Sequence, residues 1–203
     1  MVANRERFKD DVKHVRVPMG ETAMRELRVG DEILLSGTIV TARDVGHEFM
    51  VRERPPYLVQ NLQYGALYHC GPVVKKDRKG WHVIAAGPST SMRVEPFTAT
   101  VIRDYGLRAV IGKGGLGEES RKALVRHGCV YLHAVGGLAA MLARRVKRVV
   151  SVHKLREFGA PDAFWVLEVE DFPAVVTMDS HGESIHKQVH LYSDRVAREL
   201  LGI

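Results

Sequence analysis

Ala85–Gly117, reading AAGPSTSMRVEPFTATVIRDYGLRAVIGKGGLG, gives the strongest indication of how this chain folds. Two apolar runs in and before it predict buried strands, and each run is followed by a loop. Between the loops, Ser91–Tyr105 predicts a helix, with Pro96 tolerated in its first turn. Loops at strand ends bind small anions, because free backbone N–H groups and flexible cations converge there. The stretch therefore predicts an α/β fold with an anion site at its strand ends.

Three cations stand at three separate predicted strand ends. Arg93 lies in the first loop, Lys113 lies in the glycine-dense second loop, and Arg43 follows the apolar run ILLSGTIVTA. A hydroxyl cluster precedes Arg93, and it consists of Ser89, Thr90 and Ser91. Arginine can bind a carboxylate in bidentate fashion, whereas lysine supplies a movable point charge. This pattern predicts a pocket for a small molecule with more than one negative charge.

Away from this stretch, strands and helices alternate only in part. Strands are predicted at 12–18, 32–42, 66–74, 81–86, 109–111, 130–134, 146–153, 163–169 and 174–179, and helices at 21–27, 44–54, 91–105, 117–127, 136–145 and 185–201. Because several strands follow one another directly, the pattern favours a mixed sheet or partial barrel with packed helices. We expect one α/β domain over residues 1–203, with residues 1–11 as a flexible N-terminus.

Composition narrows the class of protein. Hydrophobic residues make up 45% of the 203 residues, which is enough to bury a core. No apolar run approaches bilayer length and Met1–Lys13 is charged throughout, so we expect a soluble, cytoplasmic protein without a secretory signal. Cys70 and Cys129 each lie in an apolar stretch and are expected to be buried, reduced thiols. Two thiolates are too few to hold an iron–sulfur cluster.

A net charge of +6 requires nucleic acid to be weighed as a partner. A Walker A loop needs Ser or Thr after its lysine, but Gly114 follows Lys113. The same turn matches the opening of a KH-type RNA clamp. Its next residues, Glu118 and Glu119, would repel an RNA backbone, so an RNA-binding module stays as the disfavoured alternative. The densest basic cluster, Arg144–Arg148, is predicted to end a helix.

The histidines give one candidate. His186 and His190 are one helical turn apart, but HKQVH lacks the acidic second residue of the zinc-protease pattern, so no metal site is predicted. His47 follows Arg43 by four residues and shares its predicted helix face, which makes it a candidate for lining the pocket.

Five ordered motifs carry a family resemblance: LLSGTIVTARDVGH, YHCGPV, AAGPSTSMR, AVIGKGG and VEDFPAVV. Together they closely resemble the C-terminal domain, or separate β subunit, of class I fumarate hydratases and the related tartrate dehydratases. The similarity runs from about Val15 to the end of the chain. It implies a swivelling β/β/α domain and a hydro-lyase of the tricarboxylic acid cycle that interconverts fumarate and L-malate, with tartrate as the alternative substrate.

The resemblance also implies partners. The [4Fe-4S] cluster of the family is held by three cysteines of an α subunit or N-terminal domain, and not by a chain like this one. The implied assembly is a heterotetramer with that α subunit, and homodimerisation of the chain itself is left open. No membrane partner is expected.

Motif by motif, the resemblance assigns roles to individual residues. Arg43 in TARD, Arg93 in GPSTSMR and Lys113 in IGKGG match carboxylate-binding cations. Ser89 matches a hydroxyl residue, usually threonine, proposed as the base that exchanges the carbon-bound proton. The full predicted substrate-binding set is Arg43, Arg93, Lys113, His47, Thr90 and Gly114, with Ser89 as the catalytic residue. The family commonly has Met-Asp after the arginine, where this chain has Val94-Glu95, and this departure leaves the substrate preference open.

Overall fold

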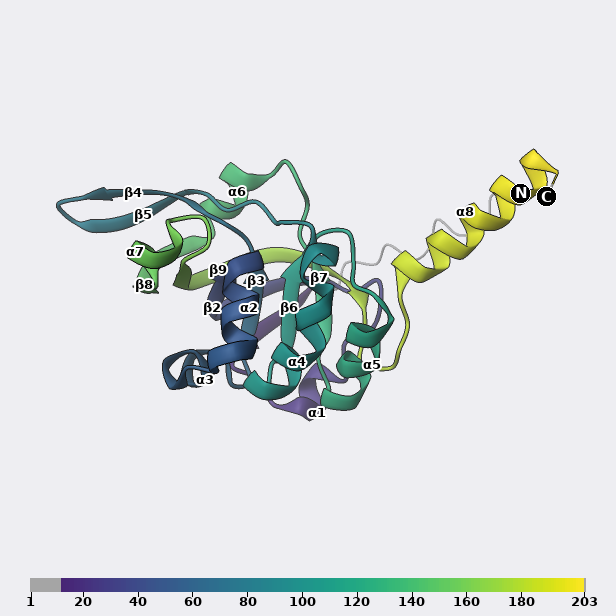
Figure 1. The fold of residues 1–203 in the computed structure, drawn as a ribbon, viewed down its shortest axis with the longest axis horizontal. Helices are drawn as coiled ribbons and strands as arrows, with labels where there is room; N and C mark the ends of the chain where they lie inside the picture. The colour runs from purple at the N-terminus through teal and green to yellow at the C-terminus, as the bar shows by residue number, and fades with distance from the viewer. Residues whose placement is uncertain (1–11, 203) are drawn as a thin grey trace.

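The computed structural model describes residues 12–202, and within this part a seven-stranded sheet has the order β1-β2-β3-β6-β7-β9-β8 (Figure 1). The strands are β1 Lys13–Val17, β2 Glu32–Ala42, β3 Ala66–His69, β6 Ala109–Gly112, β7 Val130–His133, β8 Val146–His153 and β9 Phe164–Met178. A separate hairpin pairs β4 Val73–Asp77 with β5 Gly80–Ala85. The expected flexible segment at 1–11 lies outside the described residues.

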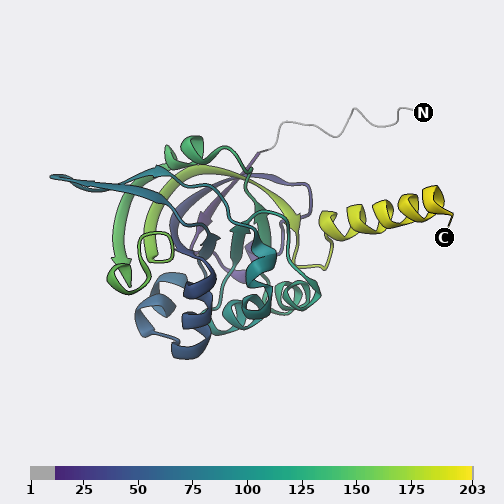
Figure 2. The same cartoon turned by 45° about the horizontal axis from the view of Figure 1, so that its top comes forward.

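The sheet closes on itself. β2, β3, β6 and β7 are parallel neighbours, while β9 runs antiparallel to both β7 and β2. The five strands β2, β3, β6, β7 and β9 therefore form a closed, barrel-like ring, and Figure 2 shows how they curve around it. The prediction of an α/β fold with a mixed sheet or partial barrel is confirmed.

Helices cover one side of this barrel (Figures 1 and 2). The helices are α1 Glu21–Met24, α2 Asp44–Glu53, α3 Pro56–Leu62, α4 Glu95–Tyr105, α5 Glu118–His127, α6 Ala139–Ala143, α7 Leu155–Phe158 and α8 Ile185–Leu201, with a 3₁₀ turn at Ser91–Val94. α4 and α5 end where they do because Gly106 and Gly128 take up left-handed conformations, at φ of 61° and 59°.

Strand alternation divides the apolar residues between two cores. On β2, Leu35 and Ile39 belong to the core inside the barrel, whereas Val40 and Ala42 pack in the layer between barrel and helices. Both kinds of position are fully buried. A strand covered on both faces reads as a continuous apolar run, which is why the β2 segment was identifiable from sequence.

Two strand predictions were wrong in extent. The strands expected at 163–169 and 174–179 are one strand, β9, because β2 pairs with both halves. The polar EDFP segment between them is accommodated by a kink at Asp171, whose φ is 51° and whose N–H donates to Ser36 Oγ at 3.0 Å. The strand expected at 66–74 is divided, since β3 ends at His69 and β4 begins at Val73 in the separate hairpin.

The remaining differences concern short elements. α3 was not predicted, because Pro55-Pro56 was interpreted only as the end of α2; Pro56 in fact begins the next helix. The basic cluster was expected at a helix end, and Arg144 is indeed the C-cap of α6, but Lys147 and Arg148 lie on β8 and pair with Glu170 and Glu168 across the sheet. α7 was also not predicted. None of the helices between residues 12 and 202 has the length and apolarity that crossing a bilayer requires.

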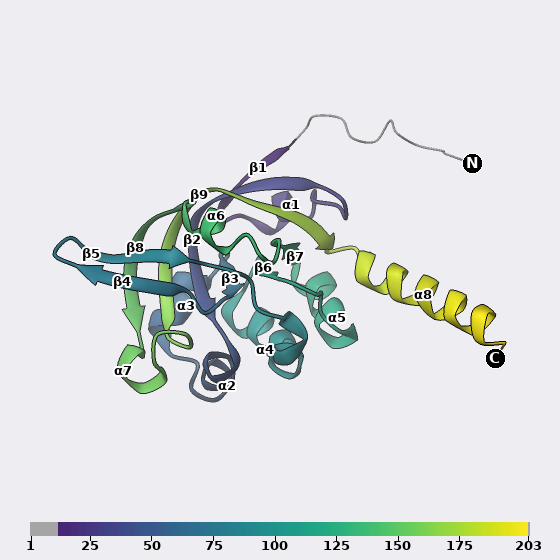
Figure 3. The same ribbon diagram turned by 90° about the horizontal axis from the view of Figure 1, so that it is seen from above.

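α8 differs from every other helix in its position. It extends away from the barrel in each of the three views, so that the C-terminus lies far from the sheet (Figures 1, 2 and 3). None of its residues is buried. Its start is fixed by Ser184, whose hydroxyl accepts the backbone N–H of Lys187.

Candidate active site

The predicted site lies at one edge of the barrel. Because β2, β3, β6 and β7 are parallel, their carboxyl ends meet there. We name this edge, with the loops that follow the four strands and residues 86–91 inserted among them, the carboxyl edge. Every residue of the predicted site belongs to it or to the helices that start from it.

Ser89 is held between the ends of β3 and β6. Its backbone N–H donates to the carbonyl of His69 at 2.7 Å, and its own carbonyl accepts the N–H of Lys113 at 3.2 Å. The Lys113 carbonyl in turn accepts the N–H of Ser91 at 3.0 Å, and Thr90 forms a parallel bridge with Lys113. The predicted base and the predicted lysine are therefore direct backbone neighbours, although they are far apart in the sequence.

Lys113 leaves this bridge toward the turn after β7. Gly114 and Gly115 follow it with φ of 81° and 78°, a conformation that side chains other than glycine rarely adopt. A Cβ placed on Gly136 would lie 3.9 Å from Lys113 Nζ, so the ammonium group lies over that turn. Gly114 is exposed and Lys113 is half-buried. The glycines let the chain turn sharply while the lysine side chain stays at the edge.

Arg93 pairs with Asp44, the residue that follows Arg43. Arg93 is 61% exposed and its guanidinium contacts Asp44 Oδ2 at 3.0 Å. Arg43 packs over Gly71, where a Cβ would lie 2.6 Å from Arg43 Cδ. The Nε of Arg43 is buried and has no hydrogen-bond partner among the described residues. An unpartnered, buried guanidinium nitrogen favours an anionic ligand, because that ligand would supply the missing acceptor.

His47 lies beneath this edge and not on its surface. It is fully buried, and its Nδ1 donates to the Arg43 carbonyl at 2.8 Å. Its Nε2 lies 3.2 Å from His69 Nε2. Burial lowers the pKa of His47 to about 4, so the ring is neutral at physiological pH. As a substrate-binding residue His47 stays a prediction, since its contacts here are to the protein.

Three residues at or beneath the edge, His69, Ser91 and Tyr131, are not in the set of site residues predicted from sequence. His69 hydrogen bonds through Nδ1 to Ser91 Oγ at 2.9 Å, and Ser91 Oγ lies 2.7 Å from the Tyr131 hydroxyl. The motif YHCGPV contains His69 and the hydroxyl cluster contains Ser91. Nothing in the sequence connects either of them with Tyr131, because the contact depends on the pairing of β6 with β7.

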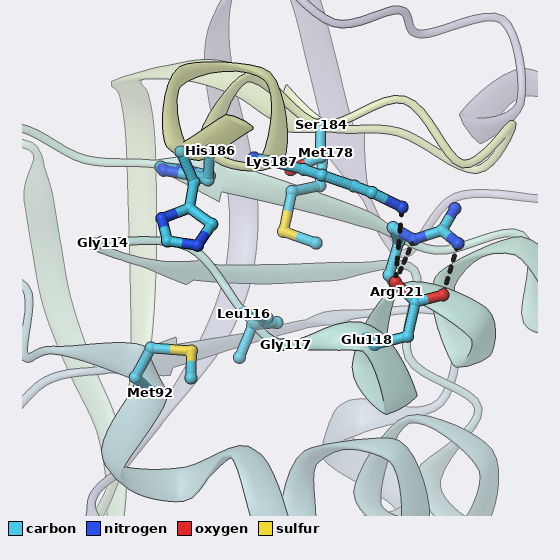
Figure 4. Close-up of a pocket in the computed structure, with 11 residues that line it drawn as sticks. Met92, Gly114, Leu116, Gly117, Glu118, Arg121, Met178, Ser184, His186 and Lys187 are labelled. Atoms are coloured by element: carbon cyan, nitrogen blue, oxygen red, sulfur yellow. Dashed lines mark hydrogen bonds and ion pairs between the residues drawn. The ribbon is translucent and has the colours of Figure 1, made fainter. Parts of the chain in front are cut away.

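A cavity of about 450 Å³ lies beside the glycine turn (Figure 4). Of the predicted site residues it includes only Gly114. Within it Glu118 bridges Arg121 at 2.5 Å and Lys187 at 3.8 Å, while His186 faces Gly115. The cavity thus shares the wall of the Lys113 turn, but Arg43, Arg93 and Ser89 do not line it.

The residues of this chain do not fit an iron–sulfur cluster. Cys70 and Cys129 are buried and unpaired, and burial raises the pKa of the Cys70 thiol to about 12. In the described residues, no three His, Cys, Asp or Glu side chains are grouped so that they could hold a metal ion. A cluster needs three or four exposed thiolates in one place.

The structure is an α/β domain: a closed mixed barrel whose carboxyl edge carries a hydroxyl, a lysine and two arginines. The chain belongs to the family described as Fumarase C-terminus, whose model matches residues 2–189.

Two kinds of relative share this domain. A protein of Geobacillus stearothermophilus named as a class I fumarate hydratase is 46% identical over 176 residues, which cover 86% of this chain but only 34% of that protein. A Methanocaldococcus jannaschii protein named as an L(+)-tartrate dehydratase subunit beta is 40% identical, covering 89% of this chain and 94% of that subunit. The L(+)-tartrate dehydratase subunit beta of Escherichia coli is 34% identical, covering 90% and 91%.

Proposed function

We propose that this chain is the β subunit of a two-chain hydro-lyase that interconverts fumarate and L-malate by reversible hydration. The observation that carries the proposal is the backbone pairing of Ser89 with Lys113 at an edge that also contains Arg43, whose Nε has no partner among the described residues. This arrangement puts a hydroxyl and cations on one small area, as a dicarboxylate substrate requires.

Carboxylate binding follows from the chemistry of the cations. Arg43 offers its unpartnered Nε and supports one carboxylate, while Lys113 and the exposed Arg93 supply charge for the other. Removing a proton next to a carboxylate builds negative charge on that group. Preorganised cations therefore stabilise the transition state more than the ground state, which raises the rate and not only the affinity.

Ser89 is the proposed base for the carbon-bound proton. Its backbone is fixed on both sides, by His69 and by Lys113, so its half-buried side chain has a defined position. A serine hydroxyl is a weak base, and nearby positive charge from Lys113 and Arg93 favours its ionised form. The role of these charges is thus double: they bind the substrate and they assist the base.

The cluster is assigned to a partner chain. Support comes from the names of two relatives, which call proteins 40% and 34% identical to this chain a subunit beta. We propose that an α subunit binds the [4Fe-4S] cluster and covers the carboxyl edge, forming a heterotetramer in the cytoplasm. The thiols of Cys70 and Cys129 are too deeply buried to take part.

Tartrate is the second candidate substrate, because relatives 40% and 34% identical are named L(+)-tartrate dehydratase subunits, whereas the relative named fumarate hydratase is 46% identical. An RNA-binding module of the KH type loses support, because the GKGG turn follows strand β6 where a KH loop joins two helices.

Co-expression with an α-type chain from the same genome tests the proposal. The assembled protein, loaded with iron and sulfide without oxygen, is assayed against fumarate, mesaconate and L(+)-tartrate. We expect the highest kcat/KM for fumarate, and no turnover by the metal-stripped chain alone. A higher kcat/KM for tartrate would make tartrate, and not fumarate, the substrate. Turnover by the metal-stripped chain alone would overturn the two-chain model.

A further inference from the structure

Beneath the carboxyl edge runs an unbroken series of buried polar side chains. His47 contacts His69 at 3.2 Å, His69 contacts Ser91 at 2.9 Å, and Ser91 contacts Tyr131 at 2.7 Å. His47, Ser91 and Tyr131 are fully buried and His69 is 1% exposed. The members come from α2, β3, the loop after Pro88 and β7. The four side chains thus connect neighbouring parts of the fold through buried hydrogen bonds.

The direction of every hydrogen bond in the series follows from its last acceptor. A carbonyl oxygen only accepts, so His47 must hold its proton on Nδ1 to donate to Arg43. A neutral His47 then has an unprotonated Nε2, so His69 must donate to it from its own Nε2. His69 Nδ1 is thus an acceptor for the Ser91 hydroxyl, and Ser91 accepts from Tyr131.

Burial keeps both rings neutral, which this direction requires. Desolvation lowers the pKa of His47 to about 4 and lowers the pKa of His69 well below its usual value. A charged His69 would place a second donor against Ser91 and disrupt the order. At physiological pH the series therefore has one hydrogen-bond arrangement.

The series ends on the segments that carry the predicted site. It begins beside Gly112, the residue before Lys113, where a Cβ would lie 2.0 Å from Ser91 Oγ and 2.9 Å from the Tyr131 hydroxyl. It ends on the carbonyl of Arg43. In its middle, the carbonyl of His69 accepts the N–H of Ser89 at 2.7 Å. One set of side chains thus connects the base and the segments of two cations.

We propose that His47, His69, Ser91 and Tyr131 form a hydrogen-bond chain of fixed direction that holds the segments of Arg43, Ser89 and Lys113 in position for the proposed reaction. The four are positioning residues, since they are buried and act through these segments. This inference rests on the proposed function for its catalytic consequence, but the direction of the chain is a property of the folded protein alone.

Nitrogen NMR of the isolated 203-residue chain tests the direction without any activity. The expected result is His47 protonated on Nδ1 and His69 protonated on Nε2, both neutral between about pH 6 and 8. His47 protonated on Nε2, or either ring charged in this range, would overturn the inference. The result does not depend on the substrate or on the partner chain.

Kinetics of the assembled two-chain enzyme test the consequence. Tyr131→Phe removes the first donor and leaves the ring, and Ser91→Ala interrupts the chain at its centre. We expect kcat to fall by about 10- to 100-fold with a smaller change in KM, because small displacements of reacting groups reduce rates by this order.

Tyr105→Phe is the matched control, because Tyr105 is also buried and donates its hydroxyl to a backbone carbonyl, that of Met50, at 2.9 Å. It should lower the Tm about as much as Tyr131→Phe and leave kcat unchanged. Equal kinetics in the two tyrosine variants would contradict the positioning role. If NMR gives the expected protonation and no partner or substrate yields turnover, the hydrogen-bond chain stands and the proposed function fails.

Discussion

The carboxyl edge and helix α8 differ in which kinds of side chain they bury and expose. The edge buries the polar side chains of His47, His69, Ser91 and Tyr131, and each of these four has a hydrogen-bond partner in the protein. α8 exposes apolar groups, with Val189 57% and Leu200 81% accessible, and gives them no partner within the described chain. Figure 3 shows α8 extending away from the barrel, although its first turn, with His186 facing Gly115, lies beside the carboxyl edge.

The comparison distinguishes side chains on which the folded state depends from side chains that contribute little to it. A buried polar group is stable only when its hydrogen bonds are made, so the series from His47 to Tyr131 must be complete when the chain folds. Exposed apolar groups on one helix add little to folding, and changing them alters little. Changes at the carboxyl edge should therefore alter activity strongly, whereas changes on α8 should alter neither activity nor stability.

Replacing Ser89 should have the largest effect. In the assembled enzyme Ser89→Ala should lower kcat by roughly 10²- to 10⁴-fold, the usual contribution of a general base. KM should change little, because Arg43, Arg93 and Lys113 still bind the carboxylates. Ser89→Thr should keep most of the activity, since threonine offers the same oxygen. Steady-state kinetics give the kcat and KM of both variants.

A merely structural Ser89 would give a different result. Its backbone bonds to His69 and Lys113 do not use the side chain, so alanine preserves them. A kcat for Ser89→Ala within a few-fold of the wild type, at unchanged Tm, would remove Ser89 from the chemistry and leave the edge as a binding surface only.

Removal of single cations should have the next largest effect. Lys113→Ala and Arg93→Ala should each lower kcat/KM by about 30- to 1,000-fold, as loss of a preorganised charge donor does. The Tm of the Arg93 variant should hardly move, because its pair with Asp44 is 61% and 37% exposed. Calorimetry gives the Tm and steady-state kinetics give kcat/KM on the same preparations, so the effects on stability and on activity are measured separately. Wild-type kinetics in both variants would place substrate binding elsewhere.

Local signals in the sequence predicted the elements but not the way they close. The apolar run of β2 and the left-handed glycine Gly128 after α5 are visible in the chain itself. The continuity of β9 through Asp171 is not, because it comes from pairing with β2 on both sides of the kink. A polar EDFP segment was therefore interpreted as a break between strands.

The same reason explains which part of the site was missed. Arg93 and Lys113 stand in loops beside their motifs, so residue type and spacing indicated them. His69, Ser91 and Tyr131 are joined by contacts across 22 and 40 positions of sequence. Their significance depends on which strands become neighbours, and the periodicity of apolar residues does not determine that order.

Adding a side chain at Gly112 should lower the stability of the chain by an intermediate amount. Gly112→Ala would put a Cβ 2.0 Å from Ser91 Oγ, so the hydrogen-bond chain must shift. We expect a loss of about 1–3 kcal/mol in the free energy of unfolding, the usual result of overpacking. Gly20→Ala is the control: nothing lies within 4 Å of the added Cβ and φ is already −66°. It should lose less than about 1 kcal/mol, and equal losses would show that Gly112 is not tightly packed.

The smallest effect should come from the exposed face of α8. Val189→Ser and Leu200→Ser remove apolar side chains that are 57% and 81% accessible, so little buried surface is lost. The free energy of unfolding of the isolated chain should change by less than about 0.5 kcal/mol. Leu35→Ala inside the barrel, where the side chain is fully buried, should lose about 2–5 kcal/mol in the same urea titration. Because no residue of α8 is buried and Val189 and Leu200 lie beyond its first turn, the contrast between these variants measures how little the exposed part of α8 contributes to the stability of the barrel. If either serine variant lost more than about 1 kcal/mol in the free energy of unfolding, the exposed part of α8 would have to pack on the barrel in solution. The contrast between the carboxyl edge and α8 would then no longer hold.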